Sequence, residues 1–140
     1  EDTIILVAKS LQEKNIRVNK KYSNNLPKVE VVEDQIKQIL LNLISNASEA
    51  ISEDGGQIIL TTEAQGSCVI MKVRDTGSGI SAEDKKKVFE PFFTTKGGKG
   101  TGLGLSISYG IIQDHGGSIE VESELGDGTT FTVSLPVKRV

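Results

Sequence analysis

The chain lacks most features of secreted, membrane-spanning or nucleic-acid-binding proteins. Its one cysteine, Cys68, excludes internal disulfides and cysteine-rich metal sites, and we expect it to be an ordinary strand residue. No apolar run approaches about eighteen residues, and no signal peptide or lipidation motif is visible. The net charge of -3 gives no basic excess for nucleic acid. We therefore expect a soluble domain from a reducing compartment that binds no nucleic acid.

The chain has the length of a single domain and an uneven distribution of glycine. The 140 residues suit one domain, so we take residues 1–140 as a single unit. Fifteen residues are glycine, and five of these fall between positions 97 and 104. Because glycine weakens helices and strands, that cluster calls for a functional explanation.

Apolar periodicity predicts the secondary structure. Helices are expected over residues 3–14, 33–51, 83–88 and 103–115, and strands over 16–22, 29–31, 57–63, 68–74, 119–121 and 131–135. Hairpin turns are expected at Gln65-Gly66-Ser67 and Gly126-Asp127-Gly128. Helices and strands alternate without a regular βαβ rhythm. The expected fold is an α/β (α+β) two-layer sandwich, a mixed and mostly antiparallel sheet with about three helices on one face.

A polar stripe marks the predicted 33–51 helix. Asn42, Asn46 and Glu49 lie at helical spacing beside the apolar stripe. One interpretation is a solvated face or a helix-packing hydrogen bond. The other is that an amide oxygen ligates Mg²⁺, which takes few protein ligands beside water and phosphate oxygens. The asparagines alone leave both interpretations open.

A carboxylate follows the predicted 68–74 strand. Asp75 continues the apolar face of that strand, although Asp75-Thr76-Gly77-Ser78-Gly79 is also a common kind of turn. An acceptor-only carboxylate suits the exocyclic amine of adenine and repels the carbonyl oxygen of guanine. Gly77 and Gly79 would let the backbone lie flat against the base.

The glycine cluster runs from residue 97 into the predicted 103–115 helix. A backbone without side chains can follow a polyphosphate closely, and N–H groups at a helix N-terminus donate to its oxygens. We therefore predict a phosphate cradle, to which Lys96 and Lys99 add either charge or solvation. The segment is neither a Walker P-loop nor a dinucleotide fingerprint. Its glycines predict a lid that orders on nucleotide.

Five motifs, in this order, resemble those of the catalytic domains of sensor histidine kinases. They are Asn42-Leu43-Ile44-Ser45-Asn46-Ala47, Asp75-Thr76-Gly77-Ser78-Gly79, Phe89-Glu90-Pro91-Phe92-Phe93-Thr94-Thr95-Lys96, Gly100-Thr101-Gly102-Leu103-Gly104-Leu105 and Gly126-Asp127-Gly128-Thr129-Thr130-Phe131. The third, a phenylalanine box, is most similar to the nitrogen-regulation type. The resemblance covers nearly the whole chain. It implies the Bergerat ATP-binding fold, shared with type II topoisomerase, mismatch-repair and heat-shock ATPases.

The resemblance also implies roles for single residues. Asn46 would bind Mg²⁺, Asp75 the adenine amine, and Thr130 would lie in the adenine region. The phosphates would be bound by Lys96, Gly100, Thr101, Gly102, Leu103, Gly104 and Leu105. Related ATPases resemble this chain except for a water-activating glutamate four residues before the magnesium asparagine, where this chain has Asn42. Because an amide is a poor base, we expect slow hydrolysis and a γ-phosphate kept for another nucleophile.

The implied activity is that of a protein histidine kinase in two-component signal transduction. The phosphoacceptor is expected on a helical hairpin of the same protein that precedes this chain, and the phosphoryl group then passes to a response regulator receiver domain. The single histidine, His115, ends a predicted helix and is expected to be structural. We expect a monomeric fragment of a homodimeric parent that is cytoplasmic or anchored at the inner membrane.

Two alternatives have different chemistry. An ATPase or serine-directed protein kinase on the same fold would release phosphate or transfer it to a hydroxyl group. A nucleotide-sensing module would bind without any reaction. The full glycine set and Asn46 favour the reactive alternatives over mere sensing.

Overall fold

The structure is a computed structural model that describes residues 15–22, 33–51, 55–85, 87 and 104–136. The predicted 3–14 helix and 29–31 strand lie outside these residues. So do the phenylalanine box and most of the glycine cluster.

The described residues form one five-stranded sheet in the order β1-β2-β3-β5-β4. The strands are β1 Ile16–Tyr22, β2 Gly56–Gln65, β3 Cys68–Asp75, β4 Ser118–Ser123 and β5 Thr129–Pro136. β1 runs parallel to β2, whereas the other neighbouring pairs are antiparallel. The predicted mixed, mostly antiparallel sheet is confirmed, and free Cys68 is the first residue of β3.

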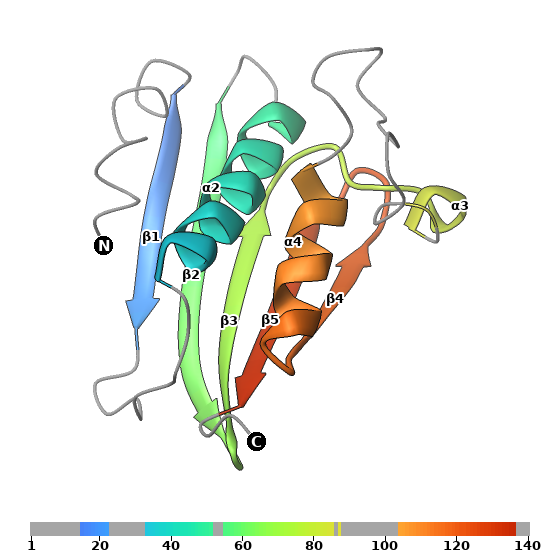
Figure 1. Ribbon diagram of the computed structural model, residues 1–140. Helices are drawn as coiled ribbons and strands as arrows, with labels where there is room; N and C mark the ends of the chain where they lie inside the picture. The colour runs from blue at the N-terminus through green and yellow to red at the C-terminus, as the bar shows by residue number, and fades with distance from the viewer. Residues whose placement is uncertain (1–14, 23–32, 52–54, 86, 88–103, 137–140) are drawn as a thin grey trace.

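Two helices cover one face of this sheet. α2 spans Glu33–Ala50 and α4 spans Gly104–Asp114, and Figure 1 shows both lying in front of the strands. The short α3, Ala82–Lys85, lies to the side of this layer. Lys85 N closes its single turn by donating a hydrogen bond to Ser81 O at 2.9 Å. The two-layer sandwich is therefore confirmed.

The core lies between the helices and the sheet. Alternate side chains of each strand point toward the helices, as a period of two requires. The most deeply buried apolar side chains of the core are Ile58, Val73 and Val133 from the strands, Ile39 and Leu43 from α2, and Ile112 from α4. The opposite face of the sheet carries no described helix, and we call it the open face. None of the described helices combines the length and apolarity needed to cross a membrane.

Candidate functional site

Several segments meet at one end of the helix-covered layer. Figure 1 shows that α2 ends, β3 ends, α4 begins and β4 turns into β5 at this end of the sheet. Ala50, the last residue of α2, accepts a hydrogen bond from Ser78 N at 3.0 Å. Ser78 O in turn accepts one from Gly126 N at 2.8 Å. The loop after β3 is thus held between the end of α2 and the β4–β5 turn.

Asp75 is a buried carboxylate at this end. Its side chain is only 3% exposed, and Oδ1 accepts a hydrogen bond from Gly77 N at 2.8 Å. Asp75 lies opposite Ile58 of β2 and Thr129 of β5, on the helix-covered face. The prediction that it continues the apolar face of its strand is confirmed. A carboxylate has about four acceptor positions, so Asp75 can also receive a ligand donor.

The glycines after Asp75 face the protein itself. A Cβ atom on Gly77 would overlap the carbonyl oxygen of Ala50, and one on Gly79 would overlap that of Glu124. These glycines therefore allow the loop to pack against α2 and the β4–β5 turn. That they also let the backbone lie flat against a base stays a prediction.

The strand register separates two adjacent threonines. Asp75 pairs with Thr129, and Arg74 pairs with Thr130. Because successive side chains point to opposite faces, Thr129 lies beside Asp75 and is 4% exposed, whereas Thr130 lies on the open face. Thr130, which was expected in the adenine region, therefore points away from the face of Asp75, and Thr129 lies beside the carboxylate.

Ser123 connects these segments and was missed by sequence reasoning. Its Oγ accepts a hydrogen bond from Ile80 N at 2.7 Å and donates to Gly128 O at 2.8 Å. It also lies 2.8 Å from Thr129 Oγ1. A signal was present, because Ser123 continues the alternation of Ile119 and Val121 just as Asp75 continues that of its own strand.

The asparagines lie on α2 near α4. Asn42 Nδ2 donates to Ser108 Oγ at 3.1 Å, and Ser108 belongs to α4 and is fully buried. The helix-packing hydrogen bond, one of the two interpretations of the polar stripe, is therefore present at Asn42. Asn46 is half-buried and lies one turn before Ala50, which the loop after β3 contacts.

The phosphate-binding candidates fall mostly outside the described residues. The candidates outside the described residues are Lys96, Gly100, Thr101, Gly102 and Leu103. Gly104 is the first residue of α4, and Leu105 is half-buried against the core. The first turn of α4 therefore presents backbone N–H groups at the end of the layer where Asp75 lies.

His115 has the structural role that was expected. Its side chain is 4% exposed, and Nδ1 donates to Ile111 O at 2.8 Å. Gly117 N donates to Ile112 O at 3.0 Å and closes the end of α4. His115 lies at the opposite end of α4 from Gly104.

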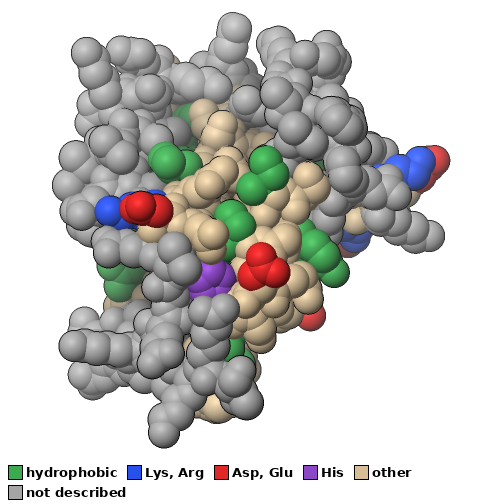
Figure 2. Space-filling view, in the orientation of Figure 1, with side chains coloured by type: hydrophobic (Ala, Val, Ile, Leu, Met, Phe, Trp, Pro, Cys, Tyr) green, Lys and Arg blue, Asp and Glu red, His purple; other side chains and the backbone are tan. Residues whose placement is uncertain are grey.

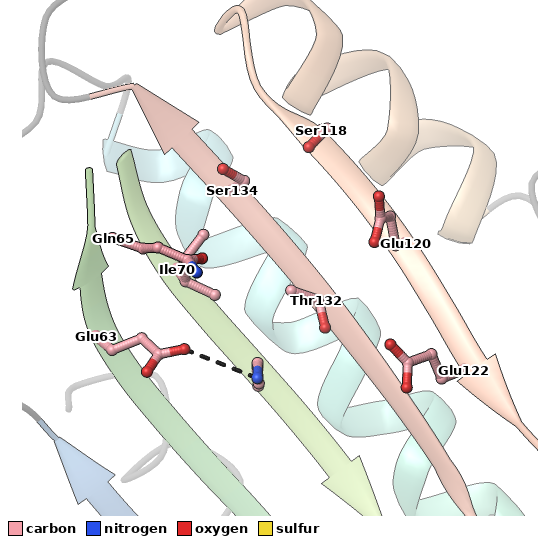
Figure 3. Close-up of a pocket in the computed structure, with 9 residues that line it drawn as sticks. Glu63, Gln65, Ile70, Ser118, Glu120, Glu122, Thr132 and Ser134 are labelled. Carbon is pink, nitrogen blue, oxygen red and sulfur yellow. Dashed lines mark ion pairs between the residues drawn. The ribbon is translucent and has the colours of Figure 1, made fainter. Parts of the chain in front are cut away.

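The other described surfaces show fewer features of a functional site. Figure 3 shows a hollow on the open face, lined by Glu63, Gln65, Ile70, Lys72, Ser118, Glu120, Glu122, Thr132 and Ser134. It contains none of the residues around Asp75. Within the described residues, no three His, Cys, Asp or Glu side chains converge as a metal site. Figure 2 shows that the described surface on the helix side is largely backbone and uncharged side chains.

Comparisons with known proteins agree with this geometry. Residues 31–139 match the family described as histidine kinase-, DNA gyrase B-, and HSP90-like ATPase. The sensor histidine kinase ZraS of Escherichia coli (strain K12) is 40% identical over 132 residues, which are 94% of this chain and 28% of ZraS. Sporulation kinase E of Bacillus subtilis (strain 168) is 39% identical over 99% of this chain and 19% of its own length.

Solved structures give the same result. The catalytic domain of histidine kinase ThkA superposes with a TM-score of 0.88 at 39% identity, over 99% of this chain and 90% of that one. Full-length ShkA in complex with AMPPNP superposes with a TM-score of 0.86 at 33% identity, over 96% of this chain and 28% of that one. The chain thus spans under a third of the full-length relatives but nearly all of an isolated catalytic domain. It belongs to the histidine kinase-, DNA gyrase B- and HSP90-like ATPase family, as a catalytic domain of the sensor histidine kinase kind.

Proposed function

We propose that this chain binds Mg-ATP and transfers the γ-phosphate to a histidine on a separate helical domain, as the catalytic domain of a protein histidine kinase. The observation that carries the proposal is the buried carboxylate of Asp75 at the end of β3. A buried carboxylate is costly unless donors surround it, and Gly77 N supplies one such donor to Oδ1 at 2.8 Å. The exocyclic amine of adenine supplies a matching donor.

The adenine contact involves Asp75 and Thr129. Both side chains lie on the helix-covered face and come from directly opposed positions of β3 and β5. Directly opposed side chains in an antiparallel pair have Cβ atoms about 5 Å apart. Thr129 therefore takes the role that sequence resemblance gave to Thr130.

The phosphates lie toward the N-terminus of α4. Backbone N–H groups of its first turn suit phosphate oxygens, and the residues from Gly100 to Leu105, together with Lys96, complete the cradle. Asn46 supplies the one protein oxygen for Mg²⁺, from a half-buried position near the end of α2. A magnesium ion bound by one amide and phosphate oxygens needs no cluster of acidic ligands. When bound, it neutralises phosphate charge during transfer.

Asn42 favours transfer over hydrolysis. An amide cannot accept a proton from water as a carboxylate does, and Asn42 Nδ2 is held by Ser108 on α4. The residue therefore braces α2 against α4 and does not activate water. The γ-phosphate remains available to a better-placed nucleophile, which supports a histidine kinase over an ATPase.

The partners follow from the same proposal. The phosphoacceptor histidine lies on a helical hairpin of the same, homodimeric protein, and residues 1–140 form its catalytic domain. Ile107 of α4 is 41% exposed and offers that hairpin an apolar contact. A response regulator receives the phosphoryl group, as histidine kinase ThkA forms a complex with response regulator TrrA. The sequence from Phe89 to Lys96 favours the nitrogen-regulation type.

Calorimetric titration with ATP and with GTP, each with and without Mg²⁺, tests the nucleotide site. We expect saturable, magnesium-dependent binding of ATP and no binding of GTP. Asn46→Ala should remove the magnesium dependence, whereas Asn19→Ala on β1, an exposed asparagine, should not. Equal binding of ATP and GTP would reject the assignment of Asp75.

Phosphotransfer tests the reaction. A helical hairpin with a phosphoacceptor histidine, taken from a histidine kinase and added in trans, should acquire radiolabel from γ-labelled ATP while free phosphate appears slowly. Rapid phosphate release without labelling of the hairpin would support the ATPase alternative. Labelling of a serine would support the serine-directed kinase.

A further inference from the structure

Ser123 lies at the centre of a buried hydrogen-bond network whose protons can be counted. A serine hydroxyl donates one hydrogen bond and accepts two. Ile80 N can only donate to it, at 2.7 Å, and Gly128 O can only accept from it, at 2.8 Å. The single proton of Ser123 is therefore committed to Gly128 O.

The third partner of Ser123 must then be a donor. Thr129 Oγ1 lies 2.8 Å from Ser123 Oγ, and either oxygen could donate if this pair stood alone. Since Ser123 has no second proton, the Thr129 hydroxyl donates to Ser123. Both side chains are at most 9% exposed, so water does not readily compete for these bonds.

The direction of that proton determines what Thr129 offers to a ligand. With its proton turned to Ser123, the Thr129 hydroxyl presents only lone pairs elsewhere. Asp75, directly opposite on β3, is also an acceptor when it is ionised. The two neighbouring side chains thus form an edge that only accepts hydrogen bonds.

We propose that Ser123 is a specificity-determining positioning residue, which holds the Thr129 proton away from the ligand so that the site selects a base presenting a donor. This inference rests on the proposed function and deepens it. A 6-amino purine satisfies an accepting edge, directly or through a water that donates to it. A 6-oxo purine places a carbonyl oxygen against two acceptors and is rejected.

The test compares binding of ATP with that of inosine triphosphate, which carries a 6-oxo group where ATP has a 6-amino group. In Ser123→Ala the Thr129 proton is released and can turn to Asp75 or to the carbonyl oxygen of the ligand. Either orientation weakens the preference for ATP, so the ratio of the two dissociation constants should fall about tenfold, the effect of one hydrogen bond. Ser118→Ala, at an exposed serine of the same strand, should leave the ratio unchanged.

The same comparison in a Thr129→Val variant separates an effect on the Thr129 proton from general damage to the loop. Thr129→Val keeps the shape of Thr129 but has no hydroxyl proton to redirect. If Ser123 acts through that proton, adding Ser123→Ala to Thr129→Val should not change the ratio further. An equal fall of the ratio in both backgrounds would overturn the inference while leaving the ATP site intact. Failure of the unaltered chain to bind ATP would instead reject the proposed function, and this inference with it.

A measurement on the unaltered protein covers the case in which Ser123→Ala does not fold. Neutron diffraction from deuterated crystals locates the deuteron on Thr129 Oγ1. We expect it on the line to Ser123 Oγ. A deuteron directed toward Asp75 would overturn the inference regardless of any variant.

Discussion

The two faces of the sheet use the same strands for different purposes. On the helix-covered face, side chains near the ends of β3, β4 and β5 form a buried polar cluster, the site cluster: Asp75, Ser123 and Thr129. On the open face, the residues next to these in the sequence are Arg74, Glu122 and Thr130. Arg74 and Glu122 are exposed, and Thr130 is half-buried. One position along a strand thus separates a residue of the proposed binding site from a surface residue.

The difference follows from the pleat. Successive side chains of a strand point to opposite faces, so a shift of one residue would exchange the two sets completely. The register of β3 with β2 and β5 sets which side chains point to which face. Apolar residues such as Val73 and Phe131 hold this register by packing under the helices. The core therefore determines which polar residues reach the site.

The largest effect of a single substitution is expected for Gly79→Ala, in the loop after β3. A Cβ atom there would overlap the carbonyl oxygen of Glu124, and Gly79 has a φ of +77°. We expect a loss of about 3 kcal/mol or more in the free energy of unfolding, from overlap plus left-handed strain. Denaturant unfolding measures this loss.

Gly66→Ala is the matched control for that prediction. Gly66 also has a positive φ, +61°, but lies at the β2–β3 turn with nothing within 4 Å of its Cβ position. We expect it to cost about 1 kcal/mol, the strain alone. Equal losses in the two variants would mean that the contact of the loop with the β4–β5 turn is not rigid.

Asp75→Asn should have the next largest effect, on ligand binding. The substitution keeps the shape of the side chain but removes its charge and replaces one acceptor by a donor. We expect ATP affinity to fall about 10- to 100-fold, the effect of a hydrogen bond to a charged group. Arg74→Gln, one residue away on the open face, should change it by less than about threefold. Titration of both variants with ATP shows which face of the sheet binds the nucleotide. A larger effect at Arg74 would move the site to the open face.

Much of the fold was predictable because its signals are local. Period-two alternation identified β3, and periods of three and four identified α2, each close to its observed bounds. The carboxylate at Asp75 was predictable for the same reason, since it extends an alternating strand by one position. Residue type and spacing were sufficient there.

The rest depended on contacts between distant segments. Thr129 and Thr130 are adjacent and chemically identical, so only the pairing of β5 with β3 shows which of them lies beside Asp75. Ser123 belongs to no recognised motif, and its partners Ile80 and Gly128 come from other segments. The close approach of Gly77 to the end of α2 likewise has no local signal.

Ser108→Ala tests whether the helix layer is tied together by polar contacts as well as by packing. The variant removes the acceptor of the Asn42 Nδ2 hydrogen bond between α2 and α4, at a fully buried position. We expect a loss of about 1 to 2 kcal/mol in the free energy of unfolding. Ser134→Ala, on the open face of β5, should cost under about 0.5 kcal/mol. If the two variants lose the same stability, the contact between these helices depends on apolar packing alone.

The smallest effect is expected for the ion pair of the open face. Lys72 Nζ lies 3.7 Å from Glu63 Oε1, and the two side chains are 43% and 48% exposed (Figure 3). Water screens such a pair, so a double-mutant cycle with Lys72→Ala and Glu63→Ala should give a coupling energy of no more than about 0.5 kcal/mol. In 1 M salt, where the screening length is about 3 Å, the coupling should vanish. A salt-resistant coupling above about 1 kcal/mol would mean that this face also holds its charges in a fixed, desolvated arrangement, and the contrast between the two faces would fail.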